Sequence, residues 1–567
     1  MDDPSGFTVK DEPPPGSAAG EKQEKVPQRE KIIEAVADAG VQFWCDPDGH
    51  AFATVPCEDP EPDGPIMHLR VRGRRFALIC RRLYGEANPV NGPYGSRPGS
   101  VSDSAMGEAV PAFEAMALAT NVVNEPGVRL IESRGSIWID LRDETFRAIR
   151  VTAEGWTIEK QANAPLVRPD GLRALPVPVR ENGTLDRLRG LFNMEDGDEG
   201  KGNFRLIVAW LVAALYPTGP FTILALDGEQ GSGKTTTARK LRKLVDPNAA
   251  DLRSMPRNED DLLIAAINGR VVALDNVSYI ENDMADALCR VATGAGFGKR
   301  TLYSDLGETI VSVSRPILLN GIPSLLARGD LADRSIAITL PQIPDEKRRP
   351  EKAVWAEFDA AAPGILGLLL DGLAMALRHL PTLQLERLPR MADFARLACA
   401  AAPAFGWTAV EMLYAMEANR AASVETVVQG DPVSEAVRTI LQDMGPSGTW
   451  EGTATLLLEA VNGKVSPDVK NERGWPKDGA RLSTRLRRSA PALRRAGVNV
   501  VLPTQGGRDG RKIVIRHSEK ITERSKRSDR SSNLPGLPGG NNGNGGNADP
   551  PSPGGGTGDA DIDEIFL

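Results

Sequence analysis

A glycine-rich segment near the middle of the chain has the residue types and spacing that phosphate binding requires. Gly228 and Gly233 are separated by four residues and are followed at once by Lys234 and Thr235. Unlike a chance turn, the segment lies between an apolar, strand-like run, FTILAL, and a helix-like run, TTTARKLRKLV. Glycines let backbone N–H groups turn toward phosphate oxygens, the lysine reaches the β and γ phosphates, and the threonine hydroxyl ligates magnesium. We expect ATP and Mg²⁺ to bind through Gly228, Glu229, Gln230, Gly231, Ser232, Gly233, Lys234, Thr235 and Thr236.

Two further apolar runs end in polar residues that could complete such a site. NGRVVALDN ends at Asp275-Asn276, and Asp275 is the expected carboxylate on the magnesium side. SRPILLNGI carries Asn320, which is placed to position an attacking water beside the γ-phosphate. The next segment adds Arg328 and Arg334, which could act as an arginine finger in a neighbouring subunit or form surface salt bridges. We expect catalysis to depend on Lys234, Asp275, Asn320 and Arg334.

The order of these segments over residues 221–341 resembles the superfamily III helicase-like ATPases carried by phages, plasmids and integrated elements. The resemblance covers about a fifth of the chain, and it implies an AAA+-like ATPase that acts on DNA as a ring-shaped homo-oligomer. It also implies that LCRVATGAGFGKRTLYSD forms a hairpin that faces the pore of the ring and touches DNA. Gly294, Gly296, Lys299 and Arg300 are the positions carried over; a plain surface turn is the alternative.

One position departs from the pattern of that family. A second acidic residue usually follows the aspartate of the second motif, and this chain has Asn276 there. Asp275 itself, Glu229 within the loop, or Glu259 and Asp260 could compensate, and the sequence does not decide among them. The sequence therefore predicts ATP binding and leaves ATP hydrolysis open.

The C-terminal part of the chain combines an arginine-rich helix with a charged turn. Residues 479–517 predict a helix followed by two short strands, a pattern that suggests a winged helix. The segment also resembles, more weakly, the C-terminal part of mobile-element primase-helicase proteins. Phosphate attraction predicts DNA contacts from Arg485, Arg488, Arg508 and Arg511; a solvated charged helix on a protein-binding module is the alternative.

The last residues, DADIDEIFL, follow a Gly-, Asn- and Pro-rich linker. They look like the acidic tip of bacterial single-stranded-DNA-binding proteins, which recruits replication and repair enzymes. This segment either docks such a partner or only keeps the protein soluble.

Whole-chain properties indicate a multidomain cytoplasmic protein. A chain of 567 residues is too long for one hydrophobic core, and its five cysteines have no paired spacing. The N-terminus has no signal-peptide pattern, and the two most apolar runs, FRLIVAWLVAALYP and PGILGLLLDGLAMAL, are expected to be buried helices rather than membrane spans. We expect disorder at 1–28, an α+β domain at 29–165, the P-loop ATPase domain at 183–345, a helical region at 346–430, a winged-helix-like domain at 431–518 and a disordered tail at 519–567.

Two sets of chemically capable residues in the N-terminal part are interpreted as structural. Cys45, His50, Cys57 and His68 match no zinc-binding spacing. Asp140 and Asp143 could suggest the paired acids of a primase, but such acids stand two apart on one strand face, so a turn between strands is favoured. The role of the N-terminal domain stays unassigned.

Together these features predict an α/β protein with a P-loop ATPase core, an α+β N-terminal domain and a C-terminal winged-helix-like domain. The expected function is a DNA-dependent ATPase that acts as a helicase or translocase in replication of a phage-like or mobile element. One alternative is an ATP-gated DNA-binding switch or loader that does not unwind DNA. The other is a P-loop kinase, against which the basic C-terminal segment counts.

Overall fold

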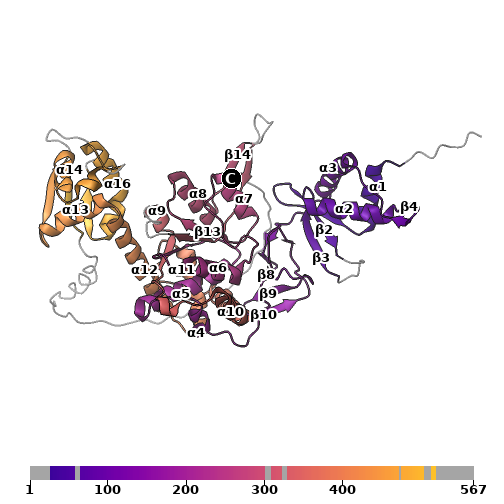
Figure 1. Ribbon diagram of the computed structural model, residues 1–567, viewed down its shortest axis with the longest axis horizontal. Coiled ribbons are helices and arrows are strands. Elements are labelled where there is room, and N and C mark those ends of the chain that lie inside the picture. Colours follow the sequence, from indigo (N-terminus) through magenta and orange to yellow (C-terminus); the bar gives the residue numbers. More distant parts are fainter. Residues whose placement is uncertain are drawn as a thin grey trace, which may run out of the picture. The chain divides into compact units, whose positions relative to one another are not determined.

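The computed structural model describes residues 26–57, 64–300, 308–321, 329–471, 474–502 and 512–518. The elements below all lie in the unit of the chain that ends at His517. The fold is mixed α/β, as expected, and Figure 1 shows its helices and strands. The segments 1–25 and 519–567, where disorder was predicted, lie outside the described residues.

One nine-stranded sheet extends through the N-terminal part of the chain, in the order β1-β2-β3-β11-β6-β7-β8-β9-β10. The alternating residues 136–160 predict a β-meander, and they form the antiparallel strands β8, β9 and β10; β7 pairs antiparallel with β8 in addition. The short strand β11 pairs in parallel with both β3 and β6 and so joins the two halves of the sheet, which the sequence did not predict. The strands are β1 (Gln42–Cys45), β2 (Ala51–Pro56), β3 (Ile66–Arg70), β6 (Gly127–Val128), β7 (Leu130–Ser133), β8 (Ser136–Asp140), β9 (Ala148–Thr152), β10 (Gly155–Glu159) and β11 (Leu166–Val167).

Three helices pack together with the first strands of this sheet: α1 (Gln28–Asp38), α2 (Arg74–Ala87) and α3 (Asp103–Ala119). Their core contains Phe43, Phe76 and Phe113, whose rings contact one another. Between α2 and α3 the Gly-, Ser- and Pro-rich residues 91–103 predict a loop. The structure instead has a short hairpin there, formed by β4 (Val90–Gly92) and β5 (Gly95–Arg97).

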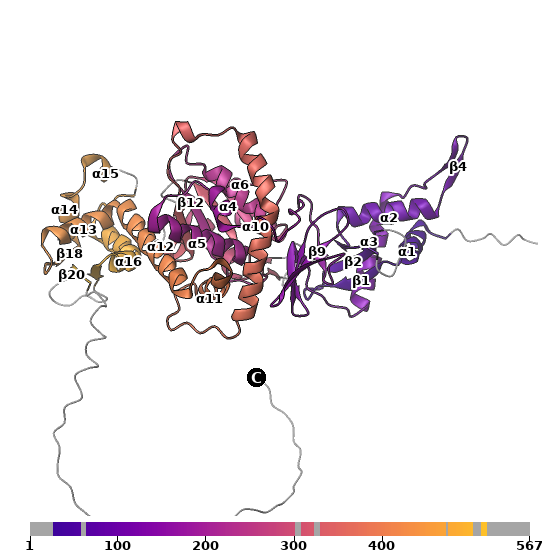
Figure 2. The same ribbon diagram turned by 90° about the horizontal axis from the view of Figure 1, so that it is seen from below.

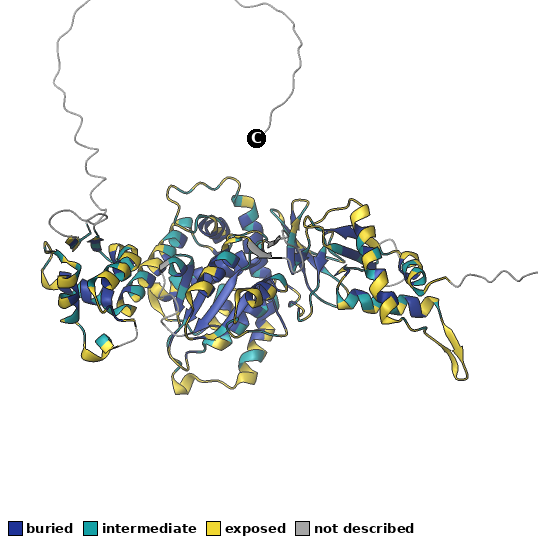
Figure 3. Cartoon of the chain, turned by 90° about the horizontal axis from the view of Figure 1, so that it is seen from above, coloured by how far each residue is buried: buried dark blue, intermediate teal, exposed yellow. Residues whose placement is uncertain are grey.

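A four-stranded parallel sheet forms the centre of the chain, in the order β13-β16-β12-β17. Alternate residues of β12 enter two different cores: Leu224 and Leu226 pack in one, Ile223 and Ala225 in the other. Both faces of the sheet are therefore covered, as the buried central strands in Figure 3 show. The strands are β12 (Ile223–Asp227), β13 (Val272–Val277), β16 (Ile317–Gly321) and β17 (Ser335–Thr339).

Helices from different parts of the chain supply these two cores. One core includes residues of α5 (Gly197–Ala214), α6 (Lys234–Val245), α10 (Glu351–His379), α11 (Ala392–Ala401) and α12 (Ala409–Gly430). The other includes residues of α7 (Glu259–Ile267), α8 (Asn282–Thr293) and α9 (Gly329–Ala332). The short helix α4 (Leu185–Gly190) precedes α5.

Helix α10 is longer than the apolar run in the sequence suggested. Among the described residues it is the one helix long and apolar enough to cross a membrane. Most of that apolar stretch, 67%, is buried inside the fold, where α10 packs against α5 and α11. This burial agrees with the prediction of a buried helix.

After β13 and α8, two strands form a separate antiparallel hairpin, β14 (Phe297–Arg300) with β15 (Glu308–Val311). Helix α8 ends at Gly294, whose φ of +82° is left-handed and suits glycine. A hairpin, rather than a plain surface turn, therefore occupies the segment where the sequence predicted one. Its connecting residues, 301–307, lie outside the described residues.

The C-terminal part of the unit that ends at His517 has its own core, built by three main helices and a small sheet. The sequence predicted one helix and two strands from residue 479 on; the structure adds β18, which comes earlier in the chain and pairs with β20. The elements are α13 (Pro432–Asp443), β18 (Thr449–Thr453), α14 (Ala454–Asn462), α15 (Pro467–Asn471), α16 (Gly479–Arg495), β19 (Val498–Val501) and β20 (Lys512–His517), with the sheet order β18-β20-β19.

Candidate functional site

The glycine-rich loop connects β12 directly to α6, and its backbone conformation requires glycine. Gly228 has φ +138°, and a Cβ built on it would lie 2.5 Å from the carbonyl oxygen of Leu340, too close for any side chain. Gly231 and Gly233 have φ of +85° and +83°, also in the left-handed region. The loop thus brings backbone close to the first turn of α6, where N–H groups are free to bind an anion.

The side chains of Lys234 and Asn193 both donate hydrogen bonds to backbone carbonyl oxygens of the glycine loop. The Nζ of Lys234 donates hydrogen bonds to the carbonyl oxygens of Gly228, at 2.6 Å, and Glu229, at 2.9 Å. The Nδ2 of Asn193 donates to the carbonyl oxygens of Ser232, at 3.1 Å, and Pro341, at 2.5 Å. The sequence did not single out Asn193, because it lies far from the loop along the chain.

Thr235, Asp275 and Asn320 meet at the carboxyl edge of the parallel sheet. Asp275 Oδ1 lies 3.2 Å from Thr235 Oγ1 and accepts a hydrogen bond of 2.5 Å from Asn320 Nδ2. Asn320 Nδ2 also lies 3.3 Å from Thr235 Oγ1. The register explains the meeting, because β16 lies between β13 and β12 and all three strands run in parallel. A hydroxyl and a carboxylate side by side are oxygen ligands of the kind that Mg²⁺ prefers.

Asn276, beside this cluster, has an unusual backbone conformation. Its φ is +52°, and its N–H donates a 2.9 Å hydrogen bond to Asp275 Oδ1. Of the acids that could compensate for it, Glu259 accepts a 2.5 Å hydrogen bond from Arg290 Nη2. An ion pair on the helices α7 and α8 therefore already engages that carboxylate.

Asp227 is a further acid at this edge that the sequence did not single out. It ends β12 just before Gly228, and its Oδ1 is buried without a hydrogen-bond partner among the described residues. Burial raises the pKa of Asp227, while a hydrogen bond with Thr339 and the charge of Lys234 act in the opposite direction. The position of Asp227 directly before the glycine loop was the one sequence signal that could have drawn attention to it.

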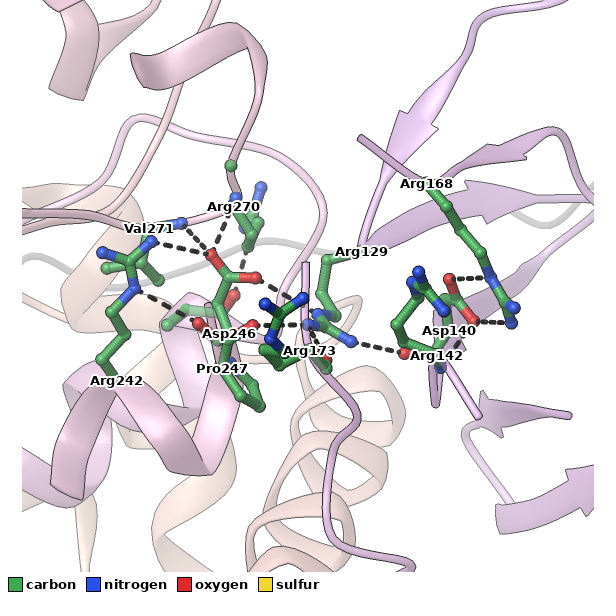
Figure 4. A network of polar contacts seen from close by, with 12 residues as sticks. Arg129, Asp140, Arg142, Arg168, Arg173, Arg242, Asp246, Pro247, Arg270 and Val271 are labelled. Atoms are coloured by element: carbon green, nitrogen blue, oxygen red, sulfur yellow. Dashed lines mark hydrogen bonds and ion pairs between the residues drawn. The ribbon is translucent and has the colours of Figure 1, made fainter. Parts of the chain in front are cut away.

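A buried polar cluster around Asp246 anchors the far end of α6, as Figure 4 shows. The carboxylate accepts hydrogen bonds from Arg129 Nε at 3.2 Å and from the N–H groups of Arg270 and Val271, both at 3.0 Å. Arg129 comes from the nine-stranded sheet and also donates to the carbonyl oxygen of Asp140, at 3.0 Å. The cluster therefore ties the N-terminal sheet to the helix that begins at the glycine loop.

Arg334 does not join the residues at the carboxyl edge. It directly precedes β17, whose first residue, Ser335, pairs with Ile223 at the start of β12. Arg334 thus lies at the amino edge of the sheet, the edge opposite Lys234, and its Nη1 donates to the carbonyl oxygen of Asp330 at 3.1 Å. Within one chain, Arg334 therefore lies apart from the other expected catalytic residues, which are at the carboxyl edge. Arg328 lies outside the described residues.

The structure distinguishes among the residues predicted to contact DNA. Arg485 is partly buried and already engaged, because its guanidinium donates to Asp431 Oδ1 at 2.5 Å and to the carbonyl oxygen of Gly474 at 2.9 Å. Arg488, one turn further along α16, is exposed. Lys299 and Arg300 belong to β14 by their backbone. Arg508 and Arg511 lie outside the described residues.

The N-terminal acids are engaged in ion pairs. Asp140 accepts two hydrogen bonds from Arg168, at 2.6 Å and 2.8 Å, and Asp143 accepts two from Arg147, from Nε at 2.7 Å and from the backbone N–H at 2.9 Å. Such ion pairs agree with the structural interpretation of these two acids.

The metal-capable residues of the N-terminal part do not assemble either. Over the described part of the chain, the one group close enough to share a metal ion is Asp46, Asp48 and His50, which contains no cysteine.

Comparison with known proteins gives the family context of this site. Residues 185–425 match the model described as the actinomycete integrative conjugative element replication protein, and residues 433–531 match the C-terminal domain of the same protein. No curated protein matches the chain.

Among solved structures, an A-form apo structure of the NrS-1 C-terminal region has 12% identity and a TM-score of 0.36, over 86% of this chain and 98% of that one. Another apo structure of the same region has 13% identity and a TM-score of 0.36, over 88% and 100%. This likeness is too distant to inform function. The two matched family regions together span more than half of the chain. The chain is therefore a replication-related protein of a mobile element.

Proposed function

We propose that this replication protein binds ATP with Mg²⁺ at the glycine loop and uses it to act on DNA. The observation that carries the proposal is the meeting of Thr235, Asp275 and Asn320 within hydrogen-bonding distance behind a loop that only glycines can form. The residues fit the nucleotide, because Lys234 already lies against the loop with its ammonium satisfied by carbonyl oxygens that a phosphate could replace.

In this proposal each side chain has a separate task. The N–H groups at the start of α6 and Lys234 bind the phosphates, and Thr235 and Asp275 hold the metal ion. Asn320 can hold a water molecule by its amide, because its Nδ2 and Oδ1 offer a donor and an acceptor. Bound Mg²⁺ would neutralise charge that builds up on the phosphate oxygens.

Arg334 supports the further proposal of a homo-oligomeric ring of the superfamily III type. Because it lies at the opposite edge of its own sheet, it could serve only the site of a neighbouring copy. The hairpin of β14 and β15 supports a DNA contact inside such a ring. The three helices and three-stranded sheet of the C-terminal part support a winged helix, with Arg488 among its phosphate contacts.

The test is ATP binding and steady-state ATP hydrolysis by the full chain, with and without single-stranded DNA. Lys234→Ala should abolish both binding and hydrolysis, whereas the control Lys243→Ala, on the same helix and partly exposed beside Asp251, should leave them unchanged. DNA-stimulated hydrolysis followed by strand displacement would support the helicase. ATP binding that survives Lys234→Ala would overturn the proposed site.

A second candidate function is an ATP-gated DNA-binding switch or loader that does not unwind DNA. Asn276 favours it, because an amide cannot take a proton from water as a carboxylate can. In this case ATP would change DNA affinity while no phosphate is released. The kinase alternative lacks support, because the family matches are to replication proteins.

A further inference from the structure

We infer that α2 and the β4–β5 hairpin form a surface that binds single-stranded DNA, separate from the C-terminal arginines. The region lies outside both family matches, which begin at residue 185. Between residues 66 and 97 the chain has one acidic residue, Glu86, although its net charge is −8. The same stretch has these arginines: Arg70, Arg72, Arg74, Arg75, Arg81, Arg82 and Arg97.

Helix α2 presents a basic stripe to the solvent. Arg74, Leu78 and Arg82 are spaced four residues apart, which places them on one face of the helix, and all three are exposed. The opposite face carries Phe76 and Cys80, which are buried in the core. The core therefore fixes which side of α2 faces outward.

Part of the positive charge on this surface is not neutralised by the protein. Arg72 is paired with Glu114 at 2.5 Å, Arg81 with Asp103 at 2.6 Å and Arg82 with Glu86 at 3.5 Å. By contrast, Arg74 and Arg97 have no ion-pair partner among the described residues. Their guanidinium groups are available to phosphates, which they bind well because of their planar, forked geometry.

The hairpin places an aromatic ring beyond the end of this stripe. Tyr94, in its turn, is fully exposed, at 102%. Figure 2 shows the hairpin projecting past the end of α2. The chain that leaves the hairpin is fixed to α2, because the N–H of Gly99 donates a 3.1 Å hydrogen bond to the carbonyl oxygen of Gly85. A Cβ on Gly85 would lie 2.9 Å from the carbonyl oxygen of Gly99, so this contact requires glycine.

Arginines beside an exposed aromatic ring match the chemistry of an unpaired strand. The phosphates meet the arginines, and an unstacked base can stack on the tyrosine ring, which a base inside a duplex cannot do. An anionic lipid surface fits less well, because membrane-surface helices insert an apolar face and that face of α2 is buried.

The test uses the full chain and a fluorescent single-stranded oligothymidine, titrated at several salt concentrations. Arg74→Glu/Arg97→Glu should weaken binding at least about tenfold and reduce the slope of log K against log salt by about 1.4, at about 0.7 for each phosphate that the variant no longer neutralises. Tyr94→Ala should weaken binding about fivefold or more with little change in slope. The control, Lys160→Glu, changes an exposed cation just past β10, at the other edge of the sheet, and should change neither quantity.

Photo-crosslinking with iododeoxyuridine oligonucleotides separates this surface from the proposed C-terminal one. We expect a crosslinked peptide that contains Tyr94, and ATP binding by the variants should be unchanged, so the result does not depend on the nucleotide site. The inference is overturned if the double arginine variant keeps the wild-type affinity and salt slope. It is equally overturned if the variant loses binding to phosphatidylserine vesicles but not to DNA.

Discussion

Replacing Asp246 with alanine should destabilise the centre of the protein by about 3–5 kcal/mol, the usual result of removing one partner of a buried ion pair. The side chain is 0% exposed and accepts hydrogen bonds from Arg129 Nε and from two backbone N–H groups. Hydrogen bonds to a charged group contribute about 1.5–3 kcal/mol each. The three share one carboxylate, so their contributions do not add fully, and the ion-pair figure is the better guide.

In the variant, Arg129 Nε and the N–H groups of Arg270 and Val271 would have no other acceptor in place of the Asp246 carboxylate. Arg129 is itself 0% exposed, and its other donors already bond the carbonyl oxygens of Asp140, Arg173 and Pro247. Water is excluded as well, because the N–H groups of Arg270 and Val271 belong to buried residues. The ion-pair figure of about 3–5 kcal/mol is therefore expected without relief from water or from another acceptor.

The measurement is urea unfolding followed by tryptophan fluorescence, since Trp210 is buried in the adjoining core. Hydrogen exchange of the amides at 270 and 271 should rise in the variant and localise the effect. As a control, Asp198→Ala removes an exposed partner of Lys201 and should change stability by less than about 0.5 kcal/mol. A loss below about 1.5 kcal/mol for Asp246→Ala, with unchanged exchange, would refute the reasoning.

Three further predictions concern the loop, hydrolysis and pH. Asn193→Ala removes the hydrogen bonds that support the glycine loop, so ATP affinity should fall about tenfold by equilibrium titration; an unchanged affinity would show that the loop holds its shape alone. Asn276→Asp restores a second carboxylate beside Asp275 and should raise the rate of phosphate release; if it does not, the missing acid is not what limits hydrolysis. Burial lowers the pKa of His68 from 6.5 to about 4, so the unfolded chain takes up a proton first as pH falls. Stability should therefore decrease by about 2 kcal/mol between pH 7.5 and 5, at about 1.4 kcal/mol per pH unit below 6.5, and level off below 4. His68→Phe should flatten this dependence in thermal melts, and an equally steep curve for the variant would exclude His68 as its source.

Much of the fold could be predicted from local pattern. The strands β12, β13 and β16, the meander of β8 to β10 and the helix α6 all follow from apolar runs and from alternation in the sequence. The hairpin β4–β5 was missed because its residues, VNG and GSR, carry no apolar alternation. Strand β18 was missed because TWEGT is short and half exposed, and its partner β20 follows only after α16. Pairing between distant segments leaves little trace in either one alone.

The sequence by itself determined the candidate phosphate loop, because the residues that such a loop needs are contiguous and its glycines, lysine and threonine have few substitutes. It also indicated Asp275 and Asn320, since polar residues at the ends of parallel strands gather at one edge of a sheet. Only the tertiary structure decided which charged groups are already engaged: Asp431 binds Arg485, and Arg129 binds Asp246. It likewise decided that Arg334 lies at the opposite edge from Lys234. The physical reason is that whether a charged group forms an ion pair depends on its distance from a partner and on its burial. Both depend on how remote segments pack, and the spacing of residues along the chain does not determine that packing.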